Sequence, residues 1–298
     1  MSDFSDLHRH LDGSIRPSTL SDLASERGLE VPSDLVFRPG MGLDEALSRF
    51  AFTLSLLERP ETVRRVASEI CEDAAKEGVT TLEIRFAPQL HRGADPATIV
   101  DAAVEGAAGR AGIILCGLYG EPLSMLNELV EIARTRSGVV AIDLAGGPSR
   151  AHAIRLGDYA PAFARAKTLG IGRTVHAAEG RSPSEIRIAI EELGAQRIGH
   201  GTTLLEDDAV VDLVIARGVT IEACPTSNVH TGVIASTREH PLPKWLARGV
   251  PACINTDNTL LSAVNAPEEY ANARAIPGMS DELLEKAVAF GHSAAFRR

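Results

Sequence analysis

Short apolar runs alternate with amphipathic stretches along most of the chain. Eight of these runs are rich in β-branched and other apolar residues, and a turn or a polar residue closely follows each of them. This pattern predicts eight strands, at residues 5–10, 79–86, 112–118, 139–144, 174–177, 197–200, 219–224 and 252–255.

Helical patterns separate the predicted strands. Residues 60–77 begin with Pro-Glu and carry Val63, Val66 and Ile70 on one stripe, with charged residues on the opposite face. Gly78 then suits the end of a helix. Comparable stretches predict further helices at residues 96–110, 124–135, 159–169, 183–193, 207–217 and 242–247.

Eight alternating units of strand and helix favour a (β/α)₈ TIM barrel within the α/β class, with an open doubly wound sheet as the alternative. The polar residues His10, Glu179, His200 and Asp257 fall at or just past the ends of the first, fifth, sixth and eighth strands. In a barrel these ends converge on one mouth, whereas an open sheet keeps its first and last strands apart. We therefore expect one barrel domain over residues 1–298, with the Pro/Gly-rich residues 30–42 lying over the mouth.

The composition indicates which kinds of molecule the protein binds. The formal charge of −10 and the pI near 5.4 argue against a nucleic acid or an anionic membrane and favour a small ligand. The chain has no apolar run of about 18 residues, and Met1 to Phe4 lack the features of a signal peptide. We therefore expect a cytoplasmic protein, while its oligomeric state cannot be predicted. The cysteines lie far apart without a C-x-x-C pair, so we expect them reduced and buried.

The segment His8-Arg9-His10 places two imidazoles on one face of a strand, because side chains alternate with period two. Such a pair alone also fits surface or core histidines, but His176 lies on the fifth predicted strand and Asp257 follows the eighth. Three imidazoles and a carboxylate suit zinc, with water in an open position. A second ion would often need a carbamylated lysine at a strand end, and no lysine of this chain stands at one. We therefore expect one zinc ion per chain.

Seven motifs, taken in order, resemble those of the adenosine deaminase family of metal-dependent hydrolases. The resemblance covers almost the whole chain, and the ordered set is far more specific than any one motif. The motifs are HRHLDGS at residues 8–14, EIRFAP at 83–88, DLAG at 143–146, HAAE at 176–179, RIGHG at 197–201, EACPTSN at 222–228 and NTD at 255–257.

The resemblance implies a zinc-dependent hydrolytic deaminase. Glu179 is similar to the family residue that protonates a ring nitrogen while activated water attacks the carbon bearing the amine. His200 is similar to the residue that accepts or steers the water proton and stabilises the hydroxide. Ammonia then leaves and a carbonyl remains. The implied zinc ligands are His8, His10, His176 and Asp257.

For the substrate, the resemblance points to a nucleoside-like molecule. Asp12 resembles the residue that meets the ribose 5′-hydroxyl, and the backbone amide of Gly146 resembles a donor to the purine edge. Asn258, however, stands where the family usually has a second aspartate, and an amide cannot ionise. Two further departures are Gly147-Pro148 after the DLAG motif and Tyr119-Gly120 in place of an Arg-His pair. We expect the reaction to be retained while the preferred base or its substituent has changed.

Two other classes of function remain open. The same site could hydrolyse a different substrate, such as an N6-substituted purine, a pterin or another cyclic amidine, or the chain could be a non-catalytic binding protein. The H-x-E and P-C-x-x-C motifs of deaminases that act on polynucleotides are absent, which again argues against nucleic acid. The pattern predicts only surface or structural roles for His91, His152, His230, His240 and His292, and turn geometry for Cys224, Pro225 and Asn228.

Overall fold

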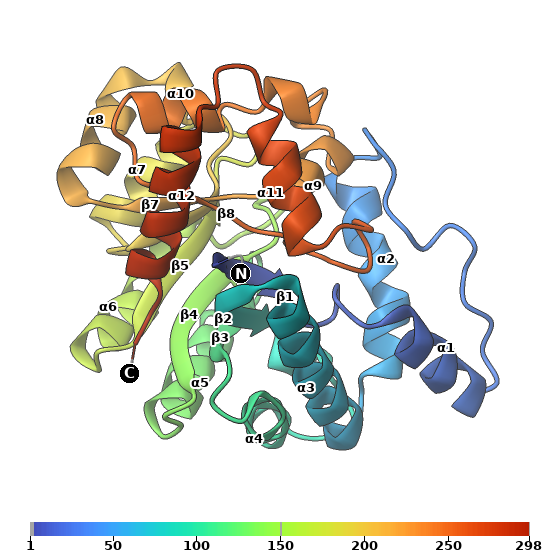
Figure 1. The fold of residues 1–298 in the computed structure, drawn as a ribbon. Coiled ribbons are helices and arrows are strands. Elements are labelled where there is room, and N and C mark those ends of the chain that lie inside the picture. The colour runs from blue at the N-terminus through green and yellow to red at the C-terminus, as the bar shows by residue number, and fades with distance from the viewer. Residues whose placement is uncertain (1–2, 150, 298) are drawn as a thin grey trace.

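Eight parallel strands form a barrel in the computed structural model, which describes residues 3–149 and 151–297 (Figure 1). The strands hydrogen-bond to one another in chain order, so the (β/α)₈ prediction is confirmed and the open sheet is wrong. Met1 and Ser2, part of the segment in which we expect no signal peptide, lie outside the described residues. The strands are β1 Phe4–His10, β2 Val79–Phe86, β3 Gly112–Leu118, β4 Val139–Ala145, β5 Gly172–Ala177, β6 Arg197–His200, β7 Thr220–Ala223 and β8 Ala252–Ile254.

The first strand completes the barrel against the segment that follows the last strand. The backbone N–H of His10 donates to the carbonyl of Asp257 at 2.7 Å, and the N–H of Asp257 donates to the carbonyl of His8 at 2.8 Å. The side-chain Oδ1 of Asn255 accepts from the N–H of Leu7 at 2.8 Å. Barrel closure therefore brings residues almost 250 positions apart in sequence into direct contact.

The helices surround the strands (Figure 1), and the predicted ones form where the apolar stripes place them. In α3, Pro60 stands in the first turn, Val63 and Val66 are fully buried, and Gly78 ends the helix with a left-handed φ of 82°. The helices are α1 Pro17–Glu26, α2 Leu43–Leu56, α3 Pro60–Glu77, α4 Pro96–Ala107, α5 Leu123–Arg134, α6 Ala160–Thr168, α7 Ser184–Glu191, α8 Asp208–Arg217, α9 Pro225–His230, α10 Leu242–Ala247, α11 Ala266–Arg274 and α12 Asp281–Ala294.

Four helices of nine residues or more, α1, α2, α11 and α12, are not among the predicted ones. In α2 the apolar residues do not form a single buried stripe, and Leu47 is 43% exposed, because this helix lies over the mouth. In α12 a usable signal was present, since the side chain of Ser280 accepts a hydrogen bond from the N–H of Leu283 and caps the helix.

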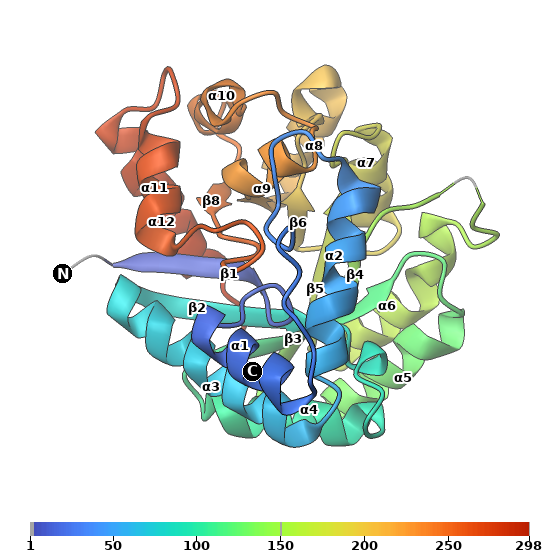
Figure 2. The same cartoon turned by 90° about the vertical axis from the view of Figure 1, so that its right-hand side faces the viewer.

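The segment that leads into α2 crosses the mouth of the barrel, as predicted for residues 30–42. The N–H of Phe37 donates to the carbonyl of Leu261 at 2.6 Å, and the N–H of Gly40 donates to that of Val229 at 2.9 Å. In Figure 2 this segment and α2 run across the side of the barrel that faces the viewer. They form a cover over the strand ends.

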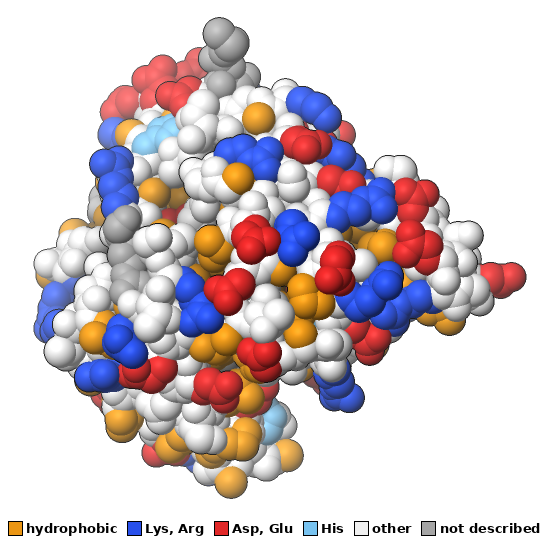
Figure 3. Space-filling model, turned by 90° about the horizontal axis from the view of Figure 1, so that it is seen from below, with side chains coloured by type: hydrophobic (Ala, Val, Ile, Leu, Met, Phe, Trp, Pro, Cys, Tyr) orange, Lys and Arg blue, Asp and Glu red, His pale blue; other side chains and the backbone are white. Residues whose placement is uncertain are grey.

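The surface carries both signs of charge. Figure 3 shows Lys and Arg side chains interspersed with Asp and Glu on one face. Ion pairs from Arg16, which precedes α1, to Asp73, at 2.6 Å, and from Asp22 in α1 to Arg65, at 2.9 Å, connect this part of the chain to α3. Within the described residues, none of the helices is long and apolar enough to span a bilayer. The burial predicted for the cysteines is confirmed, since Cys71, Cys116, Cys224 and Cys253 are all buried and free.

A histidine-rich site at the barrel mouth

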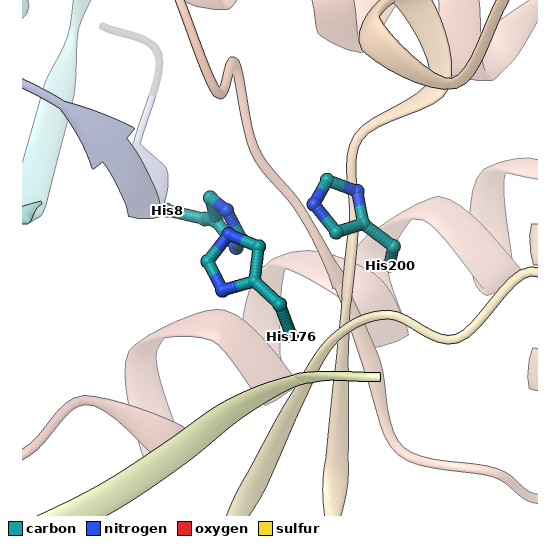
Figure 4. A group of neighbouring side chains, drawn as sticks. All are labelled: His8, His176 and His200. Carbon is teal, nitrogen blue, oxygen red and sulfur yellow. The ribbon is translucent and has the colours of Figure 1, made fainter. Parts of the chain in front are cut away.

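Histidines from three different strands point toward one another at the carboxyl end of the barrel (Figure 4). The ring centroid of His8 lies 4.5 Å from that of His176 and 4.9 Å from that of His200. His10 lies on the same face of β1 as His8, with ring centroids 5.3 Å apart, as the alternation of side chains predicts. The barrel therefore gathers the histidines of the HRH, HAAE and RIGH motifs in one place.

Three pairs of the predicted ligands have donor atoms at spacings close to those around one ion. Nε2 of His10 lies 3.4 Å from Nε2 of His176, and Oδ1 of Asp257 lies 3.5 Å from Nε2 of His10 and 3.7 Å from Nε2 of His8. Tetrahedral zinc with bonds of about 2.0–2.1 Å needs ligand atoms roughly 3.3–3.4 Å apart. Nε2 of His8 is buried and has no hydrogen-bond partner among the described residues, as expected of an atom that faces a metal. The donor set fits zinc.

Two of the three ligand imidazoles, those of His8 and His10, are held in the neutral state that binds metals. Burial lowers the pKa of both His8 and His10 well below the ordinary value, so both rings are neutral at pH 7. Burial also opposes the charged form of His176, but the Asp143 carboxylate at 3.0 Å outweighs it and the pKa is raised. Burial raises the pKa of Asp257. Binding a cation here would reverse that effect, because a nearby positive charge favours the carboxylate.

Two buried carboxylates orient the histidines from behind. Oε2 of Glu222 accepts from Nδ1 of His8 at 2.6 Å, and Oδ2 of Asp143 lies 3.0 Å from Nδ1 of His176. Arg85 lies between the carboxylates, 2.9 Å from Asp143 and 2.8 Å from Glu222, and all three are fully buried. A carboxylate at Nδ1 places the ring proton there and turns the Nε2 lone pair toward the metal position. The sequence motifs contained these three residues, but their roles were not predicted.

Glu179 and His200 lie beside the ligands. Glu179 follows β5 by two residues and is buried, which raises the pKa of its carboxyl. The hydroxyl of Thr231 makes a side-chain hydrogen bond to it, and Oε1 lies 3.9 Å from Nδ1 of His200. Burial lowers the pKa of His200 to about 3, so its ring is neutral. The site thus combines a carboxyl that tends to keep its proton with a neutral imidazole.

The backbone is strained where the site is assembled. His200 and Asp257 have left-handed φ values of 68° and 61°, which cost non-glycine residues of order 1–3 kcal/mol each. A Cβ on Gly199 would lie 2.9 Å from the ring of His8, which is closer than a Cβ normally approaches. A glycine is therefore needed at this position of β6. Such outliers are expected where the position of a side chain matters more than local stability.

The cluster opens into a cavity with two adjoining parts. The inner part, of about 60 Å³, is lined by Phe37, Glu179, His200 and Asn258 among others. The outer part, of about 420 Å³, is lined by Asp12, Asp44, Leu54, Tyr119, Gly147 and His152 among others. His10, Leu47, Phe50 and Gly146 line both parts, so α2 forms a wall of each. The three departures from the family pattern all lie at this mouth, as the sequence predicts.

The residues predicted to face a substrate do line the cavity. Burial raises the pKa of Asp12 to about 7, and its Oδ1 has no hydrogen-bond partner among the described residues. Oδ1 of Asn258 likewise has no hydrogen-bond partner among the described residues, and Asn258 is only 3% exposed. Gly13 makes room for this amide, because a Cβ there would lie 1.9 Å from Oδ1 of Asn258. A buried polar atom without a partner at a cavity wall is expected to meet a ligand.

Three residues for which the sequence predicts only structural roles lie beside His200. Nδ2 of Asn228 lies 3.1 Å from Nδ1 of His200, and Nε2 of His240 lies 3.3 Å from Oδ1 of Asn228. Cys224 lies within reach of His200 and Asp257. Burial raises the pKa of its thiol well above the ordinary value, which makes it a poor metal ligand at neutral pH.

Known proteins with the same pattern are deaminases. The family model "Adenosine deaminase" matches residues 4–297. The adenosine deaminase of Clostridium perfringens is 35% identical over 287 residues, which cover 90% of this chain and 86% of that protein. A solved N6-mAMP deaminase of Arabidopsis superposes with a TM-score of 0.86 at 26% identity, covering 100% of this chain and 94% of that one. The adenine deaminase of Arthrobacter aurescens shares the fold, with a TM-score of 0.90 at 23% identity, covering 100% and 95%.

Proposed function

The chain belongs to the adenosine deaminase family of hydrolytic deaminases, and we propose that it is a zinc-dependent deaminase of a 6-aminopurine nucleoside or a related aminated heterocycle. The observation that carries this proposal is the convergence of the imidazoles, the Asp257 carboxyl and the buried Glu179 carboxyl on one cavity. Burial keeps the rings of His8, His10 and His200 neutral and raises the pKa of Glu179, as a metal site beside a proton donor requires.

One zinc ion would be held by His8, His10, His176 and Asp257. The candidate donor groups overlap in His8, His200 and Asp257, which supports a single centre. Zinc bound there would supply a water whose pKa is lowered to about 7. Glu222 and Asp143 keep the ligand rings in the orientation described above.

Glu179 is the proposed acid. Burial raises its pKa and so favours the protonated carboxyl, which can donate its proton to a ring nitrogen while water attacks the neighbouring carbon. His200 accepts or steers the proton of the attacking water. The C–N bond to the exocyclic amine then breaks, ammonia leaves, and the oxygen of water remains as a carbonyl.

The outer part of the cavity favours a substrate without a 5′-phosphate. Asp12 and Asp44 both line it, next to Leu54 and Tyr119. Carboxyl groups accept hydrogen bonds from sugar hydroxyls but repel a phosphate, and low dielectric strengthens the repulsion. A nucleoside therefore fits better than the nucleotide named for the Arabidopsis relative.

The base itself is open to change, because Asn258 replaces an ionisable group at the inner cavity. Alternative substrates are N6-substituted purines, pterins and other cyclic amidines. A binding protein without activity is the remaining alternative, although it would not need the proton-donating Glu179.

A screen for ammonia release tests this proposal. Zinc-loaded protein would be incubated with adenosine, adenine, N6-methyladenosine, their 5′-nucleotides and pterins. We expect release from an uncharged nucleoside or base, with nucleotides slower. Release of methylamine in place of ammonia would identify an N6-substituted substrate. A zinc-replete protein that is inert on the whole panel would favour the binding protein.

A further inference from the structure

Three hydrogen bonds connect a backbone N–H on α10 to the His200 ring. The N–H of Leu242 donates to Nδ1 of His240 at 3.2 Å, Nε2 of His240 lies 3.3 Å from Oδ1 of Asn228, and Nδ2 of Asn228 lies 3.1 Å from Nδ1 of His200. His240, Asn228 and Leu242 are all buried. None of these three residues is among the proposed metal ligands.

We call the three hydrogen bonds from Leu242 through His240 and Asn228 to His200 the relay. The direction of each bond follows from the first one, in which the N–H of Leu242 is the donor. A backbone N–H can only donate, so Nδ1 of His240 must be an acceptor, and the ring proton sits on Nε2. That N–H needs an acceptor, which fixes the carbonyl of the Asn228 amide on the side of His240. The amide NH₂ group then faces His200 and donates to Nδ1.

We propose that His240 and Asn228 are positioning residues that hold His200 as the tautomer protonated on Nε2. The Nε2 side of the His200 ring faces His8 and His176 (Figure 4). His200 therefore presents an N–H to the reaction centre. This proposal rests on the proposed function for its chemical meaning, but the tautomer itself is a property of the protein.

The consequence is a sharper role for His200. A ring nitrogen that carries a proton stabilises the attacking oxygen by donating a hydrogen bond and cannot take the proton of the water. Of the two roles given above for His200, this tautomer therefore excludes acceptance of the proton, which would pass to the carboxylate of Asp257. The relay is well protected, because Trp245 packs edge-on against the His240 ring at 5.2 Å. Burial lowers the pKa of His240 to about 3, so it stays neutral at working pH.

The tautomer is measured by nitrogen NMR of the zinc-loaded protein with ¹⁵N-labelled histidine. Signals of His200 are identified by their loss in a His200→Gln variant. We expect Nε2 to show the shift of a protonated nitrogen and Nδ1 that of an unprotonated one. The opposite pattern in the wild type overturns the proposal. This NMR measurement needs no substrate. Lack of activity on every compound would therefore overturn the proposed function but would leave the assignment of the His200 tautomer unaffected.

Variants of His240 test whether the relay sets the tautomer. His240→Phe keeps a ring but removes both hydrogen bonds, so we expect mixed tautomers of His200 and a kcat lower by about 10- to 100-fold, with KM little changed. His240→Gln can still donate to Asn228, so it should recover much of the single tautomer of His200 and much of kcat. His292→Phe is the matched control, because it makes the same exchange at a histidine that bonds Thr81 and takes no part in the relay. A His240→Phe protein with wild-type tautomer and kcat overturns the relay.

Discussion

Nδ1 of His8 lies 2.6 Å from Oε2 of Glu222, and both side chains are completely buried. The carboxylate fixes the ring proton on the side away from the proposed metal. We expect Glu222→Gln to weaken zinc affinity by about 10- to 100-fold. It should also lower the free energy of unfolding by about 3–5 kcal/mol, because Arg85 and Arg197 lose a buried counter-charge. Zinc titration against a chelator and urea unfolding measure the two effects.

Thr174→Val is the matched control for Glu222→Gln. It removes the hydroxyl that donates to Oε1 of Glu222 at 3.0 Å but leaves the bond to His8 intact. We expect its zinc affinity to stay within about threefold of wild type, against the 10- to 100-fold loss of an orienting partner. Equal affinities in wild type and Glu222→Gln would contradict an orienting role for this carboxylate.

His176→Ala should lose zinc and activity together. It removes one of the four proposed donor atoms, which lies 3.4 Å from Nε2 of His10, so the remaining ligands hold the ion too weakly to retain it in dialysis. His292→Ala serves as the control, because that histidine bonds Thr81 far from the cluster. Metal analysis after dialysis and ammonia release measure both properties. Full zinc content in the His176 variant would show that the ion binds elsewhere.

Asn258→Asp should shift substrate preference. It exchanges an unpartnered amide oxygen at the inner cavity for a group that can ionise. We expect the ratio of kcat/KM for adenosine to that for the best wild-type substrate to change by at least about tenfold. Asn265→Asp, at the cap of α11, is the control. Wild-type preference for adenosine with little change in the variant would show that Asn258 is neutral.

His91 should make stability depend on pH. Burial lowers its pKa from 6.5 to about 4, and Nδ1 donates to the carbonyl of Leu57 at 2.8 Å. Between these values only the unfolded chain binds the proton, so stability is complete above pH 6.5 and falls as pH drops toward 4. From pH 7 to pH 5 this histidine should cost about 2 kcal/mol.

The comparison with His91→Gln isolates this contribution, since glutamine does not titrate. Between pH 7 and pH 5, the free energy of unfolding of His91→Gln minus that of the wild type should increase by about 2 kcal/mol. Urea unfolding at both pH values, with the metal content held equal, measures the free energies of unfolding of the two proteins. Parallel pH profiles for the two proteins would exclude His91 as a source of the dependence.

The strands and the clustering of the histidines could be predicted from the spacing of residues within each strand. Period-two spacing places His8 and His10 on one face, and the strand ends of a barrel must meet. The helix α2 gave no such signal, because it covers the mouth and leaves Leu47 43% exposed. The carboxylates behind the histidines were within reach of the same reasoning, since Glu222 and Asp143 are charged residues inside apolar strands.

The relay to His200 could not be predicted in this way. Asn228 and His240 are 12 positions apart, in α9 and in the turn before α10, and no periodicity connects them. Their contact depends on the path of the chain after β7. The identity of the substrate is likewise a property of the assembled cavity, where Asp12, Asp44 and Asn258 come from three separate segments.

The central claim, hydrolytic deamination at a zinc site with Glu179 as acid, is tested most directly by zinc-loaded wild type beside Glu179→Gln. Both proteins should hold the same amount of zinc, because Glu179 is not a proposed ligand. Ammonia release from the best substrate should be slower in the variant by on the order of 10²–10⁴, the usual contribution of a general acid. A Glu179→Gln protein that releases ammonia at the wild-type rate, or a zinc-loaded wild type that releases none from any aminated heterocycle, would contradict the claim.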